Sequence, residues 1–142
     1  MRSVFVGTVE ISWHCLRAIL AVDRVDAIYT MPVERGERIS AFSDFDDLGV
    51  QYGIPVFREP NINDPRVVEQ IREVDPEVIY VIGWPRLVKE PLLSMPPKGC
   101  IGIHSSLLPK YRGGAPVNWG LIHGEREWGI TLMYLGAGAD NG

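Results

Sequence analysis

The stretch Val78-Ile79-Tyr80-Val81-Ile82-Gly83-Trp84-Pro85 decides the fold. An apolar run without polar alternation is typical of a strand that is buried on both faces, as the strands of a parallel sheet are. The glycine and proline that follow end the strand abruptly. We therefore expect residues 78–82 to form a central parallel strand whose carboxyl end opens at Gly83.

Short apolar runs and helical patterns alternate on both sides of this segment. We expect further strands at residues 3–9, 25–31, 56–57, 99–104 and 129–135. We expect helices at residues 12–20, 42–52, 65–74, 89–94 and 117–122, with Ser12 and Asp64 as N-caps, and a surface loop at residues 32–40. The alternation predicts an α/β fold, with a doubly wound, Rossmann-like and mostly parallel sheet and helices on both faces.

The bulk composition excludes several classes of protein. A chain of 142 residues with 46% hydrophobic and 23% charged residues suits one globular domain. A net charge of −4 argues against a general binder of nucleic acid or of membrane surfaces. The two distant cysteines, Cys15 and Cys100, suit reduced thiols and a cytoplasmic protein. No apolar run approaches the roughly 20 residues that span a bilayer, and no His/Cys/Asp cluster has metal-ligand spacing.

Three residues at predicted strand ends mark the expected site. Ligands of doubly wound sheets bind at the carboxyl ends of the strands, so Gly83, His104 and Gly136 are expected to line one crevice. The turn after the first strand contains Gly7 but lacks the other glycines of a dinucleotide fingerprint, so we do not expect NAD to bind there.

His104 is the main catalytic candidate, with Asp140 as its partner. A histidine at a strand end has a fixed backbone and can face the crevice. An aspartate beside it would hold its tautomer and favour the charged ring. Gly113-Gly114-Ala115-Pro116 would let the backbone approach a ligand closely, and residues 105–109 leave the strand with free N–H groups.

These motifs resemble the folate-dependent formyltransferases. The resemblance lies in His104-Ser105-Ser106-Leu107-Leu108-Pro109-Lys110-Tyr111-Arg112-Gly113, in Ala115-Pro116, in Trp128-Gly129-Ile130-Thr131-Leu132 and in Ala139-Asp140-Asn141-Gly142. It is close over residues 79–142 and looser over the rest. It implies that residues 1–142 form an N-terminal catalytic domain, truncated after the Asp140 loop, that uses 10-formyltetrahydrofolate in one-carbon metabolism without a metal.

The resemblance also implies roles for individual residues. The substrate amine would attack the formyl carbon, and His104 would donate to the resulting oxyanion with support from Asp140. The pterin would contact residues of two loops, Gly83, Trp84, Arg86, Leu87, Val88, Gly136, Ala137, Gly138, Ala139 and Asp140. The acceptor substrate would contact Ser105, Ser106, Lys110, Arg112 and Asn118.

The acceptor is expected to be a small-molecule amine. Residues 110–112 and 116–119 resemble the branch that formylates amino-sugar nucleotides. Three alternatives stay open: a methionyl-tRNA formyltransferase, a 10-formyltetrahydrofolate hydrolase, and a folate- or nucleotide-binding domain with impaired catalysis. The last follows from Gly102, which stands where the family has an asparagine that helps hold the oxyanion. Losing one such donor costs about 10²–10³ in kcat. Gly114 likewise replaces an arginine that is usual in the sugar branch, and the oligomeric state stays open.

Overall fold

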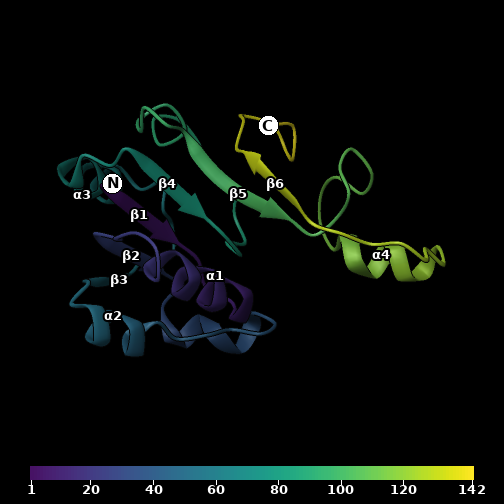
Figure 1. The fold of residues 1–142 in the computed structure, drawn as a ribbon, viewed down its shortest axis with the longest axis horizontal. Coiled ribbons are helices and arrows are strands. Elements are labelled where there is room, and N and C mark those ends of the chain that lie inside the picture. Colours follow the sequence, from purple (N-terminus) through teal and green to yellow (C-terminus); the bar gives the residue numbers. More distant parts are fainter.

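The computed structural model describes residues 1–142 as a six-stranded sheet with helices on both faces (Figure 1). The strands lie in the order β3-β2-β1-β4-β5-β6, and every neighbouring pair is parallel except β5 and β6. Their bounds are β1 (Ser3–Val6), β2 (Ala27–Thr30), β3 (Val56–Arg58), β4 (Val78–Val81), β5 (Cys100–His104) and β6 (Thr131–Tyr134). The predicted α/β fold with a mostly parallel sheet is confirmed.

The helices are α1 (Glu10–Leu20), α2 (Asp46–Tyr52), α3 (Pro65–Val74) and α4 (Pro116–Ile122), with a 3₁₀ helix η1 (Val33–Arg38). Successive residues of β1 point to opposite faces, so Phe5 packs with Leu16 of α1 and Leu48 of α2. Val4 and Val6 face the other side with the apolar stripe of α3. Burial of each such side chain contributes about 1.5–3 kcal/mol. Figure 1 shows α4 beyond the carboxyl end of β5, away from the other helices.

The central strand is β4, as expected. It pairs with β1 on one side and with β5 on the other, so Val81 lies between Val6 and Gly102. Val78, Ile79 and Val81 are buried, which the continuous apolar run requires. The carboxyl ends of β1, β4 and β5 therefore open at the same edge of the sheet.

Two local expectations are wrong. Residues 89–94 form turns instead of a helix, and only the Leu92 and Leu93 amides donate back to the Lys89 carbonyl. Ser12 is not the N-cap of α1, which begins at Glu10 after Val9. The Ser12 hydroxyl instead donates to the Ile82 carbonyl at 2.5 Å and fastens α1 to the end of β4.

Other element ends follow their local signals. Asp64 caps α3 with its carboxylate, which accepts a hydrogen bond from the Arg66 amide at 2.9 Å. Gly53 ends α2 with a φ of 66°, a left-handed conformation that glycine adopts without strain. Residues 33–38 of the expected surface loop form η1, which has no buried residue.

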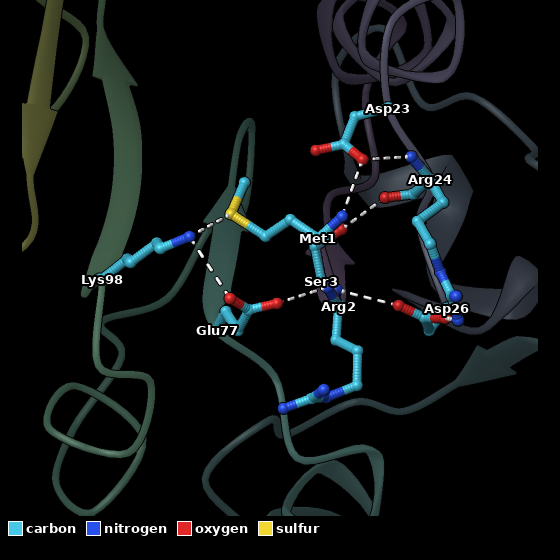
Figure 2. Close-up of polar contacts among 8 residues, drawn as sticks. All are labelled: Met1, Arg2, Ser3, Asp23, Arg24, Asp26, Glu77 and Lys98. Atoms are coloured by element: carbon cyan, nitrogen blue, oxygen red, sulfur yellow. Dashed lines mark hydrogen bonds and ion pairs between the residues drawn. The ribbon is translucent and has the colours of Figure 1, made fainter.

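Polar contacts gather at the amino end of β1, opposite the edge that opens at Gly83 (Figure 2). The Arg2 amide donates to Glu77 and the Ser3 amide donates to Asp26, each at 2.9 Å. Lys98 lies 3.3 Å from the Glu77 carboxylate, and the Met1 amino group lies 3.0 Å from Asp23. The first two contacts satisfy main-chain donors at the start of β1. No helix of the fold combines the length and apolar character needed to cross a bilayer.

Candidate functional site

A cavity of about 320 Å³ opens at the carboxyl ends of the strands. Gly83, His104 and Gly136 all line it, so the residues expected to share one crevice do so. The lining is Val81, Gly83, Trp84, Pro85, Arg86, Leu87, Val88, Ile103, His104, Met133, Leu135, Gly136, Gly138 and Asp140. Apolar walls with a few polar groups at one end suit a flat heteroaromatic ligand.

Gly83 forms the turn at which β4 meets the cavity. Its φ is 66°, and a Cβ there would lie 2.3 Å from the Ser12 hydroxyl and 2.4 Å from a Val9 methyl. Only glycine therefore allows the chain after β4 to turn this close to the start of α1. This turn directs the next loop, residues 84–88, along the cavity wall.

His104 is the last residue of β5 and is only 9% exposed. Its Nδ1 lies 3.4 Å from Asp140 Oδ1, which is ion-pair distance. Its Nε2 lies 2.7 Å from the Tyr111 carbonyl oxygen. Both ring nitrogens thus face acceptors, and an imidazolium, which donates from both, satisfies the arrangement.

Asp140 reaches the histidine from the loop that follows β6. Its φ of 51° is left-handed, a conformation that aspartate tolerates better than most residues. Its second carboxylate oxygen, Oδ2, accepts a hydrogen bond from the Gly113 amide at 2.7 Å. The carboxylate therefore ties together three segments: the end of β5, the loop before α4 and the loop after β6.

The loop after His104 is held by side chains beneath it. Ser106 is fully buried, and its hydroxyl donates to the Lys110 carbonyl at 2.6 Å. Thr131 of β6 donates to the Ser106 carbonyl at 2.7 Å and accepts from the Leu108 amide at 3.1 Å. These bonds fix the curve that places the Tyr111 carbonyl against His104.

Tyr111 is also anchored at its side chain. Its hydroxyl donates to Glu125 at 2.8 Å, and this hydrogen bond raises the pKa of the Tyr111 phenol above its usual value. The ring lies 5.2 Å from that of Trp128, measured between centroids. Main chain and side chain of Tyr111 thus link His104 to the segment between α4 and β6.

Gly102 lies two residues before His104, between β4 and β6. A Cβ at this position would lie 2.9 Å from the Val81 carbonyl oxygen and 2.9 Å from Leu135 Cδ2. The leucine side chain therefore packs against the bare main chain of Gly102. An apolar group fills the space that a larger residue at position 102 would need.

Main-chain groups beside the cavity have no partners within the chain. The amides of Arg86, Leu87 and Val88 make no hydrogen bond, and neither do the amides and carbonyls of residues 136–139. The buried indole Nε1 of Trp84 also lacks an acceptor. Donors and acceptors on two facing loops, with apolar side chains between them, suit the edges and faces of a flat heteroaromatic ligand. Ala137 and Ala139 are exposed and do not line the cavity.

The residues expected to bind the acceptor lie in several places. Lys110 is exposed and lies 3.9 Å from Glu125 beside a separate cavity of about 300 Å³. Arg112 is exposed, and Ser105 is half-buried next to His104. Asn118 lies on α4, is exposed and does not line the cavity at His104. The structure therefore brings together His104, Asp140 and the two loops, but not Asn118.

The family of the chain follows from comparison with known proteins. A sequence profile named for formyl transferases matches residues 32–142. The chain belongs to the formyl transferase family. The methionyl-tRNA formyltransferase of Trichlorobacter lovleyi is 39% identical over 145 residues, which cover 99% of this chain and 46% of that protein. The enzyme of the same name from Caldanaerobacter subterraneus is 40% identical over 147 residues, covering 100% of this chain and 47% of that protein.

Solved structures show the same fold. The glycinamide ribonucleotide transformylase 1 of Symbiobacterium toebii has a TM-score of 0.79 at 22% identity, covering 100% of this formyl transferase chain and 69% of that chain. A formyltetrahydrofolate deformylase of Pseudomonas syringae has a TM-score of 0.79 at 19% identity, covering 99% of this chain and 48% of that chain. The chain spans about half the length of the curated relatives described above.

Sequence patterns missed three groups that hold His104 and Asp140 in place. The Tyr111 carbonyl and the Gly113 amide belong to the main chain, which a sequence pattern does not distinguish. Thr131 belongs to the predicted last strand and to the motif of residues 128–132, but neither pattern gives it a role at the site. It lies directly opposite His104 in the antiparallel β5–β6 pairing, which the sequence does not show.

Proposed function

We propose that this chain transfers a formyl group from 10-formyltetrahydrofolate to the amino group of methionine attached to tRNA. The observation that carries the transfer is the His104–Asp140 pair at the end of a pterin-sized cavity. The choice of acceptor is supported by the methionyl-tRNA formyltransferases that match almost the whole chain. They favour this alternative over the amino-sugar nucleotide that the sequence analysis preferred.

The folate would supply the formyl group, and this chain's loops would position it. The free amides of residues 86–88 and the free main-chain groups of residues 136–139 would hold the pterin edges. Leu87, Val88 and Met133 would contact its faces. The formyl group would then lie toward His104 and Asp140, the polar end of the cavity.

His104 would stabilise the formyl oxygen, which gains negative charge when the amine attacks. Because both ring nitrogens already face acceptors, this oxygen would take the place of the Tyr111 carbonyl. Asp140 would keep Nδ1 in position and stabilise the charged ring. As the bond from the formyl carbon to the folate N10 breaks, the ring would give its proton to that departing nitrogen and then take up the proton that the attacking amine loses.

A second candidate function is folate binding without catalysis. One observation favours it. Position 102 has glycine in place of the asparagine that the resemblance implies as oxyanion donor, and Leu135 fills the space that an asparagine side chain would need. In that case the cavity and both loops would bind the folate, and formyl transfer would not follow.

The test compares formyl transfer to methionyl-tRNA with binding of a non-transferable 10-formyltetrahydrofolate analogue. We expect His104→Ala to lower kcat/KM by about 10²–10⁴ while the analogue still binds. Asp140→Asn should lower kcat/KM as well, because the amide carries no charge to stabilise the imidazolium. His14→Ala, which changes an exposed histidine of α1, is the matched control and should leave the rate unchanged.

Each outcome has a distinct meaning. An unchanged rate in His104→Ala would contradict the proposed mechanism. Faster transfer to an amino-sugar nucleotide than to methionyl-tRNA would contradict the proposed acceptor. Saturable binding of the analogue without transfer to any amine would support the binding-only function. Formate release without an acceptor would instead indicate hydrolysis.

A further inference from the structure

Tyr111 has a backbone conformation that its residue type does not favour. Its φ is 57°, in the left-handed region, which bulky residues rarely adopt. This strained residue is the one whose carbonyl oxygen lies 2.7 Å from His104 Nε2. A residue keeps such a conformation only where its surroundings hold it, and such residues gather at functional sites. Some part of the fold must therefore hold Tyr111 in place.

Two side chains hold the Tyr111 hydroxyl. The hydroxyl donates to Glu125 Oε1 at 2.8 Å, and it lies 3.1 Å from His123 Nδ1. A phenol has one proton to give, so His123 is the donor in the second hydrogen bond. Lys110 Nζ lies 3.9 Å from the same Glu125 oxygen, so a positive charge faces the acceptor. We call Tyr111, His123 and Glu125 the phenol clamp.

The clamp belongs to a packed unit between α4 and β6. The Tyr111 ring centroid lies 5.2 Å from that of Trp128 and 5.8 Å from that of His123. Trp128 packs against the bare main chain of Gly120, the buried residue of α4, where a Cβ would have no room. The Glu125 amide donates to the Gly120 carbonyl at 3.0 Å. Both partners of the Tyr111 side chain are therefore fixed to the end of α4.

The main chain of Tyr111 has no comparable anchor. Its amide makes no hydrogen bond, and its carbonyl accepts only from His104. The Ser106 hydroxyl fixes the loop only as far as the preceding residue, through the Lys110 carbonyl. The place of the Tyr111 carbonyl over His104 therefore depends on the side chain that the clamp holds.

We propose that Glu125 is a positioning residue of the transfer reaction. Through the Tyr111 phenol it keeps the strained main chain over His104, so that water does not reach Nε2 before a substrate oxygen replaces the carbonyl. This inference rests on the proposed function, since it concerns the same histidine ring.

Release of the clamp would open a side reaction. Tyr111 would return to an ordinary φ, and water would enter beside His104. This water would add to the formyl carbon in place of the amine, and the bond from that carbon to the folate N10 would break. N10 would take one proton of the water, and formate and the other proton would be released. A broken clamp therefore gives more formate for each formyl group transferred.

The first measurement is NMR exchange of the His104 Nε2 proton with solvent, in the chain without folate. His104→Ala assigns the signal by removing it. We expect the wild-type proton to exchange at least about tenfold more slowly than a ring proton of the exposed His14, because its hydrogen bond must open first. Tyr111→Phe, which loses only the hydroxyl, and Glu125→Ala should lose this protection. Glu125→Gln retains an acceptor oxygen and should keep part of it.

The second measurement is the ratio of formate released to formyl groups transferred to methionyl-tRNA. The ratio should rise about tenfold in Tyr111→Phe and in Glu125→Ala, the effect of about one hydrogen bond. A variant that merely lost stability would lower both products together. The control is Glu127→Gln, since Glu127 lines the same small cavity as Glu125 but makes no hydrogen bond to Tyr111. It should retain both the slow exchange and the wild-type ratio.

Two results would overturn the inference. Unchanged protection of the Nε2 proton in Tyr111→Phe and Glu125→Ala would refute the clamp. Lost protection with a constant product ratio would refute its part in the transfer. A wild-type chain that transfers no formyl group would instead refute the proposed function, and the exchange rates alone would then decide whether the clamp holds the carbonyl.

Discussion

Gly102 packs against Val81 and Leu135 in the sheet and lies two residues before His104. Replacing it by asparagine puts a Cβ within 2.9 Å of the Val81 carbonyl and of Leu135. We expect Gly102→Asn to lower the free energy of unfolding in urea by about 1–3 kcal/mol, since the tightly packed strand must shift. Adding Leu135→Ala should recover part of this loss, because one of the two close contacts is then removed.

A double-mutant cycle measures this coupling. Gly102→Asn and Leu135→Ala should deviate from additivity by at least about 0.5 kcal/mol, as residues in contact do. Leu87→Ala, which truncates an exposed leucine of the same cavity, should be additive with Gly102→Asn. Strict additivity in both pairs would mean that Leu135 does not restrict position 102.

At this scale the sequence predicts side chains better than main-chain partners. His104 and Asp140 are recognisable because their residue types and flanking motifs are distinctive, and the structure places them 3.4 Å apart. The Tyr111 carbonyl and the Gly113 amide have no such mark. Their positions depend on the curve of the loop, which Ser106 and Thr131 fix from below.

Among the helices, α3 has the clearest local signals for its start. Asp64 caps it, Pro65 opens it, and Val67, Val68 and Ile71 bury its apolar stripe against the sheet. We expect Asp64→Ala to lower the free energy of unfolding by about 1 kcal/mol, because the Arg66 amide loses its acceptor. Asp64→Asn retains a capping oxygen and should cost much less. Equal losses in the two variants, measured by urea unfolding, would argue against the cap.

The ends of the elements were harder to predict than their existence. The first strand was expected to reach Val9 but ends at Val6, because the chain turns at Gly7 and Val9 becomes the N-cap of α1. The apolar side chain of Val9 suits a strand as well as the position before a helix, so its residue type does not show where the strand ends. The helix expected at residues 89–94 is also absent. Leu92 and Leu93 pack against the sheet from turns, so their apolar character does not require a helix.

For the whole molecule, the buried phenol of Tyr29 predicts a loss of stability at high pH. Burial raises the pKa of Tyr29 to about 12, from a usual value of 10.0. The unfolded chain therefore loses this proton at lower pH than the native chain. The free energy of unfolding keeps the full contribution of Tyr29 below pH 10, and this contribution falls as the pH rises from 10 toward 12.

Urea unfolding at pH 8.5 and pH 11 would measure this effect. We expect the wild-type chain to lose stability over this range, with Tyr29 contributing on the order of 1 kcal/mol. Tyr29→Phe should show a smaller loss, because phenylalanine has no proton to release. Tyr52→Phe, which changes an exposed tyrosine of α2, should behave as the wild type. An identical pH dependence in all three proteins would refute this assignment.

The alternation of strands and helices along the sequence predicts the architecture of the molecule. It does not predict how the residues of the site are arranged. Apolar runs and caps predicted a mostly parallel sheet with a crevice at Gly83, His104 and Gly136. They did not indicate that β6 runs antiparallel to β5, which brings Thr131 opposite His104. Nor did they show that η1 lies beside Arg86, since residues 33–38 carry no apolar pattern that would fix their position.

The Tyr111 carbonyl makes the resting chain its own competitor. It lies 2.7 Å from His104 Nε2 and is tethered through Ser106, Thr131 and Glu125, so its effective concentration at the ring is high. A substrate oxygen must displace the Tyr111 carbonyl before it can accept a hydrogen bond from His104 Nε2, and a water molecule must do the same. The loop therefore keeps His104 Nε2 occupied until a well-positioned ligand displaces the carbonyl.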